Sequence, residues 1–250
     1  MTSILITGAS SGIGAALARA YARPGVTLFL GGRHGGRLRG VAASCRDKGA
    51  DVETAEVDVT DRAAMAAWIA EADDKRPLEL VVANAGISAG AGRGDAGEAQ
   101  TRAIFAVNFD GVVNTVLPAV AAMRPRRFGQ IAIVSSVAGF RGMAPAPAYA
   151  ASKAAVRVWG EGLRGELRQD GIVVSVVCPG FVETPMTDVN PFPMPFLMDA
   201  DRAAAIIVKG LARKRGRIAF PLPTFFVAWM LSVLPDRLAD WVGRQLPGKG

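Results

Sequence analysis

Tyr149 and Lys153 are the two residues whose types and spacing point most directly to chemistry. They bound the segment YAASK, which follows the loop GFRGMAPAPA and opens a predicted helix over residues 150–169. A separation of four residues places both side chains on one face of a helix, one turn apart. A free tyrosine has a pKa of about 10, and an ammonium group one turn away would favour the phenolate. The pair is therefore a candidate general acid and base, and the alternative is an idle surface pair.

The segment TGASSGIG, residues 7–14, is a candidate phosphate-binding loop between the first predicted strand and the first predicted helix. Gly8, Gly12 and Gly14 would let the backbone turn sharply and approach an anion closely. The free N–H groups and the positive dipole end of the helix N-terminus would then face a pyrophosphate. The spacing differs from G-x-G-x-x-G, so an ordinary glycine-rich turn is the alternative.

The end of the second predicted strand indicates which form of the nucleotide is bound. Sites that prefer NAD place an acidic residue there, about 20 residues beyond the glycine loop, to hold the ribose 2′-hydroxyl. The stretch LFLGGRHGGRLRG contains no acid, and Gly32 is followed by Arg33, with Arg37 and Arg39 nearby. A guanidinium fits a 2′-phosphate through paired hydrogen bonds. The sequence therefore favours NADP(H) over NAD(H), with simply solvated arginines as the alternative.

The elements that must position these residues alternate between strands and helices along the chain. Most strand candidates are continuous apolar runs, which are typical of strands covered on both faces in a parallel sheet. They are SILIT (3–7), VTLFL (26–30), VETAEV (52–57), LELVVA (78–83), QIAIVS (130–135), IVVSVV (172–177) and RIAF (217–220). Ala-rich helical stretches lie near 12–23, 61–73, 98–123, 150–169 and 200–213. This alternation predicts an α/β fold, a doubly wound parallel sheet of about seven strands in a single domain.

Further short motifs follow the glycine loop along the chain. The set comprises Thr7-Gly8-x-x-x-Gly12-x-Gly14, Asn84-Ala85-Gly86, Asn108, Ser136, Tyr149-x-x-x-Lys153 and Pro179-Gly180. Each is weak alone, but their order and separations together resemble the short-chain dehydrogenase/reductase family, from the N-terminus to about residue 210. The resemblance implies a Rossmann-like fold and an NAD(P)-dependent oxidoreductase.

The resemblance also implies a role for each matching side chain. Tyr149 would be the general acid in carbonyl reduction and the base in alcohol oxidation. Lys153 would lower the pKa of Tyr149 and bond the nicotinamide ribose. Ser136, in preference to Ser135, would hold the substrate oxygen. Asn108 would hold a water molecule that links Lys153 to solvent.

The implied cofactor site draws on several loops. Asp58 would meet the adenine, the segment 84–86 the ribose region, and Thr184 the carboxamide. The full set of predicted cofactor-binding residues is Thr7, Gly8, Ser10, Ser11, Gly12, Ile13, Gly14, Arg33, Asp58, Val59, Asn84, Ala85, Gly86, Tyr149, Lys153, Pro179, Gly180, Val182 and Thr184.

The composition argues against several other classes of protein. The chain has a single histidine, His34, which argues against a zinc site made only of protein ligands. Cys45 and Cys178 match no metal-binding or redox spacing. Because the two cysteines lie far apart in the sequence, we expect no structural disulfide and a reducing compartment. The first residues lack the features of a signal peptide, so we expect a cytoplasmic protein. Nucleic acid is not an expected partner, because no nucleic-acid-binding motif is present.

The segment after Pro179-Gly180 should select the substrate. In the family that the chain resembles, this segment, residues 184–205 here, forms a lid over the substrate. It begins TPMTDVNPFPMPFLM and is rich in Met, Phe and Pro, whose side chains make adaptable apolar walls. We therefore expect a lipid-, steroid- or aromatic-like ketone, aldehyde or alcohol, although core filling is the alternative for any single residue.

Residues 218–250 are expected to add a last strand and an apolar, basic extension to the catalytic domain formed by residues 1–217. The run IAFPLPTFFVAWMLSVLP (218–235) has no charge, but Pro221 and Pro223 should leave about eleven helical residues, too few to cross a bilayer. Residues 209–250 hold eight basic and two acidic side chains.

Two interpretations of this extension stay open. Its helix could pack on its own domain or on a partner in a homodimer or homotetramer, burying Phe225, Phe226, Trp229 and Leu234. Alternatively, residues 213–246 could form a peripheral contact with a membrane surface, with aromatic and basic side chains at headgroup level.

The leading functional hypothesis is an NADP(H)-dependent enzyme that interconverts a carbonyl and an alcohol on an apolar substrate. The alternative is a sensor or scaffold that binds the dinucleotide without turnover, and a third option is an epimerase or dehydratase of the same family. Mere binding does not require the phenol of Tyr149, which favours the enzyme.

Overall fold

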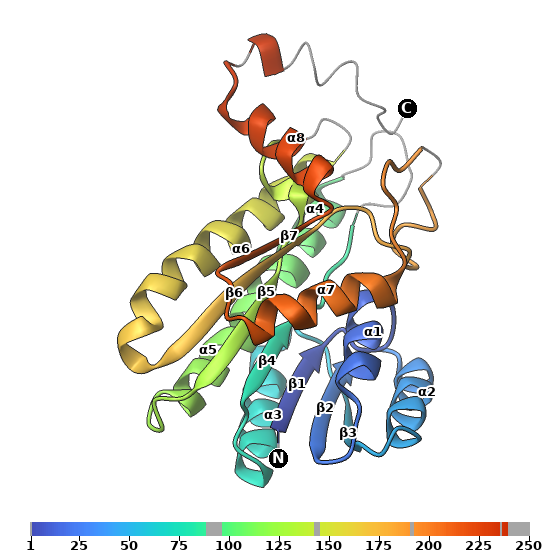
Figure 1. Ribbon diagram of the computed structural model, residues 1–250, viewed down its shortest axis with the longest axis vertical. Coiled ribbons are helices and arrows are strands. Elements are labelled where there is room, and N and C mark those ends of the chain that lie inside the picture. The colour runs from blue at the N-terminus through green and yellow to red at the C-terminus, as the bar shows by residue number, and fades with distance from the viewer. Residues whose placement is uncertain (1, 89–96, 143–145, 191–192, 236, 240–250) are drawn as a thin grey trace.

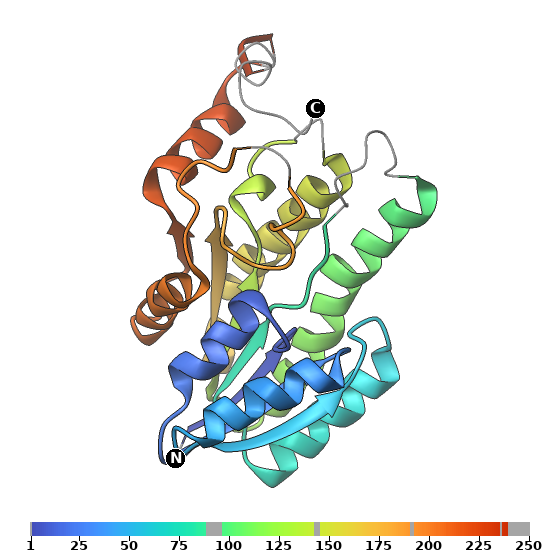
Figure 2. The same cartoon turned by 90° about the vertical axis from the view of Figure 1, so that its right-hand side faces the viewer.

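The computed structural model describes residues 2–88, 97–142, 146–190, 193–235 and 237–239. Within these residues the chain forms a seven-stranded parallel sheet, in the order β3-β2-β1-β4-β5-β6-β7, with helices on both faces (Figures 1 and 2). The strands are β1 (Thr2–Thr7), β2 (Val26–Gly32), β3 (Asp51–Glu56), β4 (Leu80–Ala83), β5 (Gly129–Val134), β6 (Ile172–Pro179) and β7 (Arg217–Phe220). The predicted doubly wound sheet and all seven of its predicted strands are confirmed.

The apolar runs arise because both faces of the sheet are covered. In β1, Ile4 and Ile6 belong to the apolar cluster on one face, while Leu5 belongs to the cluster on the other. Successive side chains of a strand point to opposite faces, so a strand buried on both faces must be apolar throughout. Helices α1, α2 and α7 supply side chains to the first cluster, and α3, α5 and α6 to the second.

The helices include one that the sequence pattern did not predict. They are α1 (Gly12–Tyr21), α2 (Gly35–Arg46), α3 (Arg62–Lys75), α4 (Glu98–Phe105), α5 (Gly111–Met123), α6 (Pro147–Glu166), α7 (Ala200–Ala212) and α8 (Leu222–Val233). The predicted helical stretches do not include α2, whose first half is rich in Gly and Arg. Its buried residues are Leu38, Val41, Ala42 and Cys45, which have helical spacing.

The predicted helix over residues 98–123 is interrupted by one wide turn. Between α4 and α5, residues Ala106–Asp110 form a π-helical turn that contains Asn108. Such single turns occur inside α-helices, frequently at functional sites. The turn lies at the carboxyl-end side of the sheet, where the candidate site is found.

The C-terminal helix begins earlier than predicted. We expected Pro221 and Pro223 to prevent helix formation, but α8 starts at Leu222 and includes Pro223 in its first turn. Proline is tolerated there because the first N–H groups of a helix have no partner within the helix.

Candidate active site

A cleft of about 460 Å³ lies at the carboxyl ends of the strands, around the boundary between β1 and β4. The chain order reverses at this boundary, since β1 pairs with β2 on one side and with β4 on the other. Open parallel sheets bind their ligands at such a switch point. A wider hollow of about 600 Å³ lies over α4, but it contains none of the predicted site residues.

The cleft brings together almost all of the predicted catalytic and cofactor-binding residues. Thr7, Gly14 and Asn108 are the exceptions, because they lie behind its wall. The cleft also contains residues outside the predicted sets, most of them sequence neighbours of predicted ones. These are Gly32, His34, Arg37, Val57, Ile87, Ser88, Val107, Val134, Ser135, Pro185, Met186, Thr187 and Val189.

The phosphate-binding loop leaves an open cradle at the start of α1. Gly8 has a φ of +66°, and a Cβ on it would lie 2.8 Å from the Cα of Ala85. A Cβ on Gly14 would lie 2.4 Å from the carbonyl oxygen of Gly8, so only glycine lets the helix approach the loop. The N-terminus of α1 thus offers free N–H groups in a space that fits a pyrophosphate.

Thr7 and Asn84 fix this loop against the end of β4. The Thr7 hydroxyl accepts hydrogen bonds from the backbone N–H groups of Asn84 (3.0 Å) and Ala85 (3.2 Å). In return, Nδ2 of Asn84 donates to the carbonyl oxygens of Thr7 (3.0 Å) and Gly8 (3.3 Å). These two side chains therefore position the loop from behind, and any contact of Thr7 with the cofactor stays a prediction.

Arg33 and Asp58 mark the end of the cleft beyond the phosphate loop. A guanidinium nitrogen of Arg33 lies 3.8 Å from a carboxylate oxygen of Asp58, and both side chains are partly exposed. Burial alone would raise the pKa of Asp58, but hydrogen bonds from Thr60 and the charge of Arg33 hold that pKa below its ordinary value. Arg37 lines the same end, which is therefore suited to an anionic group.

Tyr149, Lys153 and Ser136 meet at the opposite end of the cleft. Tyr149 lies in the first turn of α6, and Nζ of Lys153 is 5.9 Å from the centre of its ring. Burial raises the pKa of the Tyr149 phenol, while its hydrogen bond with Ser136 acts in the opposite direction. Tyr149 and Lys153 therefore lie on one face of α6, as predicted, and the phenol of Tyr149 faces the Ser136 hydroxyl.

Lys153 is a buried cation. Its side chain is almost wholly covered, and Nζ donates a hydrogen bond to the carbonyl oxygen of Val134 at 3.0 Å. Burial lowers the pKa of Lys153 to about 8, because desolvation disfavours the ammonium form. The position is thus suited to a strong interaction with a negative partner in the cleft.

The structure separates the roles of the two neighbouring serines. The Ser135 hydroxyl donates to the carbonyl oxygen of Lys153 at 2.7 Å and so ties β5 to α6. The Ser136 hydroxyl accepts from the N–H of Ala138 at 3.1 Å and lies beside the Tyr149 phenol. Of these two serines, Ser136 presents its hydroxyl to Tyr149, and its role in holding the substrate oxygen stays a prediction.

Asn108 is fully buried and connects the catalytic helix to the loop after β4. Its Oδ1 accepts from the N–H of Ile87 at 2.8 Å, and its Nδ2 donates to the carbonyl oxygen of Ile87 at 2.9 Å and to Ser152 Oγ at 3.0 Å. The Ser152 hydroxyl in turn donates to the carbonyl oxygen of Tyr149 at 2.8 Å. Asn108 thus holds α6 in place, and its predicted water stays a prediction.

The segment after β6 closes over the cleft. Val182 and Met198 pair in an isolated β-bridge, so the two ends of the segment between them lie side by side. The Thr187 hydroxyl fixes the first turn by donating to the carbonyl oxygen of Val182 at 2.7 Å and accepting from the N–H of Thr184 at 2.9 Å. The last six residues of the predicted lid, 200–205, belong to α7.

The described residues contain no group of three or more His, Cys, Asp or Glu side chains placed to hold a metal ion. The polar groups of the cleft instead suit a phosphate-bearing organic ligand and a proton transfer.

The sequence and the structure are both similar to those of known proteins. The family model described as short chain dehydrogenase matches residues 2–191. An uncharacterized oxidoreductase of Myxococcus xanthus is 38% identical over 243 residues, which cover 97% of this chain and 96% of that relative.

Solved structures with the same fold carry nicotinamide dinucleotides or act on ketones, as their descriptions state. A short-chain dehydrogenase from Sphingobium yanoikuyae in complex with NADPH has a TM-score of 0.81 and 27% identity, covering 98% of this chain and 94% of its own. One from Burkholderia phymatum in complex with NAD has a TM-score of 0.84 and 26% identity, covering 92% of each chain. The bulky-bulky ketone specific alcohol dehydrogenase from Comamonas testosteroni has a TM-score of 0.78 and 25% identity, covering 98% and 92%.

Proposed function

Because the chain belongs to the short-chain dehydrogenase/reductase family, we propose that it uses NADP(H) to interconvert a carbonyl and an alcohol on an apolar substrate. The family itself establishes an oxidoreductase that binds a nicotinamide dinucleotide. The observation that carries the finer proposal is the meeting of Tyr149, Ser136 and Lys153 at one end of a cleft whose other end carries the phosphate loop and Arg33.

The donor groups of the cleft fit such a cofactor along its length. The glycine cradle at α1 would hold the pyrophosphate, Arg33 and Asp58 would bind the adenosine half, and Lys153 would bind the second ribose. When bound, the reduced nicotinamide supplies the hydride that a carbonyl carbon accepts.

The chain's own residues act on the carbonyl oxygen. Ser136 donates a hydrogen bond to that oxygen and stabilises the negative charge that develops on it. Tyr149 transfers its phenolic proton to the same oxygen, and Lys153 favours the phenolate that remains. In alcohol oxidation the phenolate accepts the proton, so Tyr149 acts as the base.

The preference for NADP(H) rests on Arg33, and its removal gives a specific prediction. Arg33→Ala should raise the KM for NADPH by about tenfold, because a charge-assisted hydrogen bond to a phosphate contributes about 1.5–3 kcal/mol before solvent screening. The KM for NADH, which has no 2′-phosphate, should not change. Steady-state kinetics with both cofactors measure the two values.

Arg39→Ala is the matched control for this prediction. Arg39 is exposed on α2, carries the same charge and lies outside the cleft. If Arg33→Ala affects NADPH and NADH equally, or neither, the proposed preference is wrong.

The apolar substrate class rests on the segment that covers the cleft. Pro185, Met186 and Val189 line the cleft, so a carbonyl near Tyr149 is enclosed by thioether and aliphatic side chains. The similarity to an alcohol dehydrogenase described as specific for bulky-bulky ketones supports the same class.

We predict that kcat/KM rises along a series of ketones of increasing apolar size. Each buried methylene contributes about 0.8 kcal/mol, or roughly a fourfold increase, until the cleft is filled. The measurement is NADPH oxidation with acetone, cyclohexanone, acetophenone and benzophenone. A preference for small polar carbonyls would overturn this part of the proposal.

We also propose that the enzyme acts in the cytoplasm as a homodimer or homotetramer. Cys45 and Cys178 are both free and buried, which suits a reducing compartment. Burial raises the pKa of both thiols, that of Cys178 to about 12, so neither is suited to act as a nucleophile.

A further inference from the structure

Helix α8 projects from the edge of the sheet that carries β7 (Figure 1). It is anchored to the domain along one side only. Phe225 packs edge-on against Phe140 with ring centres 5.3 Å apart, and Leu231 is buried. The inner side of α8 is therefore part of the fold, and a different set of residues faces outward.

The outward side of α8 is a stripe of large apolar side chains. Leu222, Phe226, Trp229 and Val233 are separated by four, three and four residues, which places them on one face of the helix. Their exposed fractions are 71%, 57%, 43% and 62%. Of the two packing partners considered for this helix, its own domain does not bury Phe226 and Trp229. These four residues are called the apolar face of α8 below.

The segment that covers the cleft lies toward the same end of the molecule as α8 (Figures 1 and 2). Val189, Phe196 and Leu197 are exposed by 41% or more. The end of the molecule that carries α8 therefore exposes apolar side chains from two separate segments.

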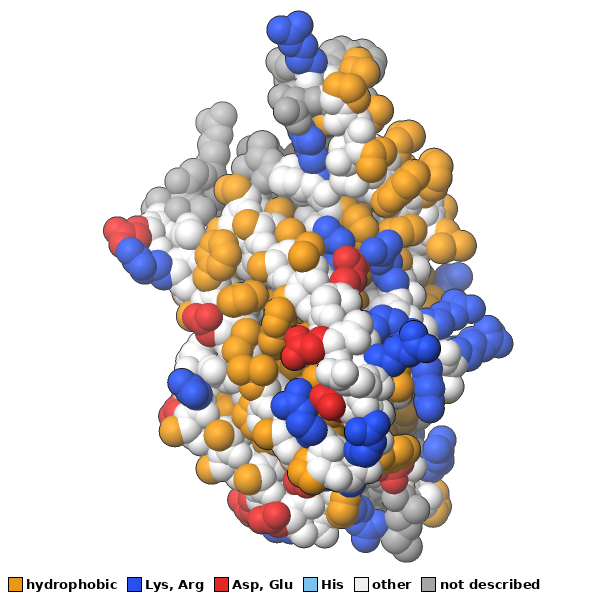
Figure 3. All heavy atoms as spheres, turned by 90° about the vertical axis from the view of Figure 1, so that its left-hand side faces the viewer, with side chains coloured by type: hydrophobic (Ala, Val, Ile, Leu, Met, Phe, Trp, Pro, Cys, Tyr) orange, Lys and Arg blue, Asp and Glu red, His pale blue; other side chains and the backbone are white. Residues whose placement is uncertain are grey.

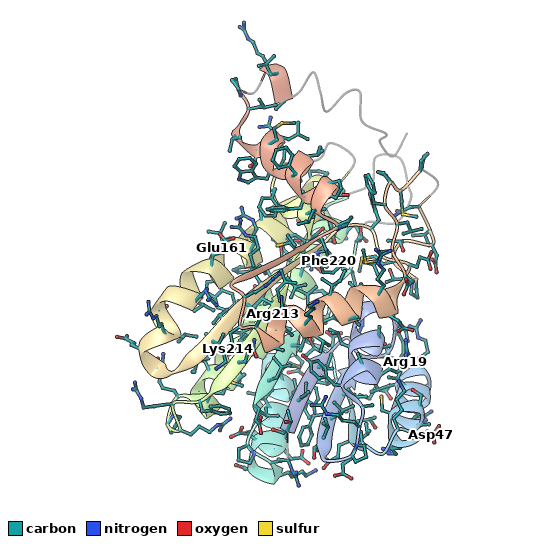
Figure 4. All side chains as sticks on the ribbon, viewed as in Figure 1. Arg19, Asp47, Glu161, Arg213, Lys214 and Phe220 are labelled. Carbon is teal, nitrogen blue, oxygen red and sulfur yellow. The ribbon has the colours of Figure 1, made fainter. Side chains whose placement is uncertain are left out.

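Basic side chains are exposed at the other end of β7 from the apolar face. Figure 3 shows hydrophobic side chains gathered at the end of the molecule that carries α8, next to a group of Lys and Arg side chains. Arg213, Lys214 and Arg215 are exposed between α7 and β7, and the first two are labelled in Figure 4. Among the described residues, no carboxylate lies within ion-pair distance of these three, so their charges are uncompensated.

The positive charge of the segment 213–215 distinguishes between two possible partners of this surface, a second copy of the chain and a lipid membrane. In a symmetric contact with a second copy, the same patch meets itself, so the partner brings the same cations and no compensating anion. Like charges placed together in an interface oppose association. An anionic lipid surface complements the same arrangement, since it accepts apolar side chains and attracts the cations of this segment.

Spanning the bilayer does not explain the patch. The twelve residues of α8 extend about 18 Å, well short of the roughly 30 Å of hydrocarbon. Among the described residues, the stretch Glu98–Met123 is long and apolar enough to span, but it packs in the domain against α3 and α6 and contains the buried Asn108. A helix lying in the plane of the interface fits the length and the charges.

We propose that the apolar face of α8, together with the basic segment 213–215, docks the protein on an anionic phospholipid surface. Trp229 then lies at headgroup depth. The docking is independent of the proposed reaction, because none of these residues lines the catalytic cleft.

The test is sedimentation of the full chain with phospholipid vesicles. The protein should bind vesicles of phosphatidylserine and phosphatidylcholine in equal parts at least tenfold more tightly than phosphatidylcholine alone, and salt should weaken that binding. The double variant F226S/W229S should lose at least tenfold in binding to the mixed vesicles. The triple variant R213Q/K214Q/R215Q should lose the preference for phosphatidylserine.

Two matched variants separate docking from general changes of surface. L117S/F128S removes two exposed apolar side chains outside α8, and R23Q/R39Q/R62Q removes three exposed charges on or beside α1, α2 and α3. Both should bind the mixed vesicles like the parent. All variants should keep the parent's turnover of a water-soluble ketone, so a failure of docking is distinguishable from a failure of the proposed reaction.

Either of two results overturns the proposal. The first is equal binding of the parent and F226S/W229S to the mixed vesicles, or binding of neither. The second is the conversion of an oligomer into a smaller species by F226S/W229S in analytical ultracentrifugation without vesicle binding, which would assign the apolar face to a second copy.

Discussion

Tyr149→Phe should lower kcat for carbonyl reduction by about a thousandfold while leaving the affinity for NADPH nearly unchanged. The substitution removes only the phenolic oxygen, so it deletes the proton donor and the partner of Ser136. The ring that lies beside Lys153 is retained. Steady-state kinetics give kcat, and titration of nicotinamide fluorescence gives the affinity for NADPH.

The chain contains a natural control, because it has only one other tyrosine. Tyr21 ends α1 outside the cleft, and burial raises the pKa of its phenol to about 12. Tyr21→Phe should retain the parent's kcat. If Tyr149→Phe keeps more than about a tenth of the parent's kcat, Tyr149 is not the general acid.

Lys153→Met should abolish most turnover and yet stabilise the cofactor-free protein. Without the ammonium the phenolate of Tyr149 loses its stabilising charge, and kcat should fall by about a hundredfold or more. Conversely, the shift of the Lys153 pKa from 10.5 to about 8 corresponds to about 3 kcal/mol of destabilisation at neutral pH. The lost hydrogen bond to Val134 offsets about 1 kcal/mol of this, so the free energy of unfolding should rise by about 2 kcal/mol.

The pH dependence of this stabilisation has a defined sign. The unfolded chain keeps Lys153 protonated up to its ordinary pKa of 10.5, whereas the folded protein releases the proton at about 8. Between these values the unfolded state binds more protons, so Lys153 makes the parent more stable as the pH rises. The advantage of Lys153→Met should therefore shrink between about pH 7 and about pH 10 in urea titrations.

The matched control is Lys209→Met, which changes an exposed lysine on α7. It should alter neither kcat nor the free energy of unfolding. A Lys153→Met variant that is less stable than the parent across this pH range would show that the buried ammonium stabilises the fold.

The strands could be predicted from the sequence because burial on both faces demands continuous apolar runs. Helix α2 could not, since its first residues are Gly and Arg and its four buried residues become informative only when the sheet beneath them is known. Local propensity was outweighed there by tertiary packing. The start of α8 was missed because a proline in the first turn of a helix was taken for a helix breaker.

The cleft could be predicted as a set of motifs, but several roles depend on distant contacts. Asn108 reaches Ile87 and Ser152, which are 21 and 44 residues away in the chain. Nothing in the sequence around Asn108 indicates the π-helical turn that aims its side chain at both. The exposed face of α8 likewise emerged only from the structure, because an uncharged aromatic helix is equally compatible with a core.

The central claim is that this protein reduces a carbonyl carbon with Tyr149 as the proton donor. The most direct test supplies benzophenone and NADPH that carries deuterium at both C4 positions of the nicotinamide, and analyses the product by mass spectrometry. We predict an alcohol that carries one deuterium at the former carbonyl carbon, formed by the parent and Tyr21→Phe but not by Tyr149→Phe. An alcohol formed equally by Tyr149→Phe, or tight NADPH binding with no product from any ketone of the series, would contradict the claim.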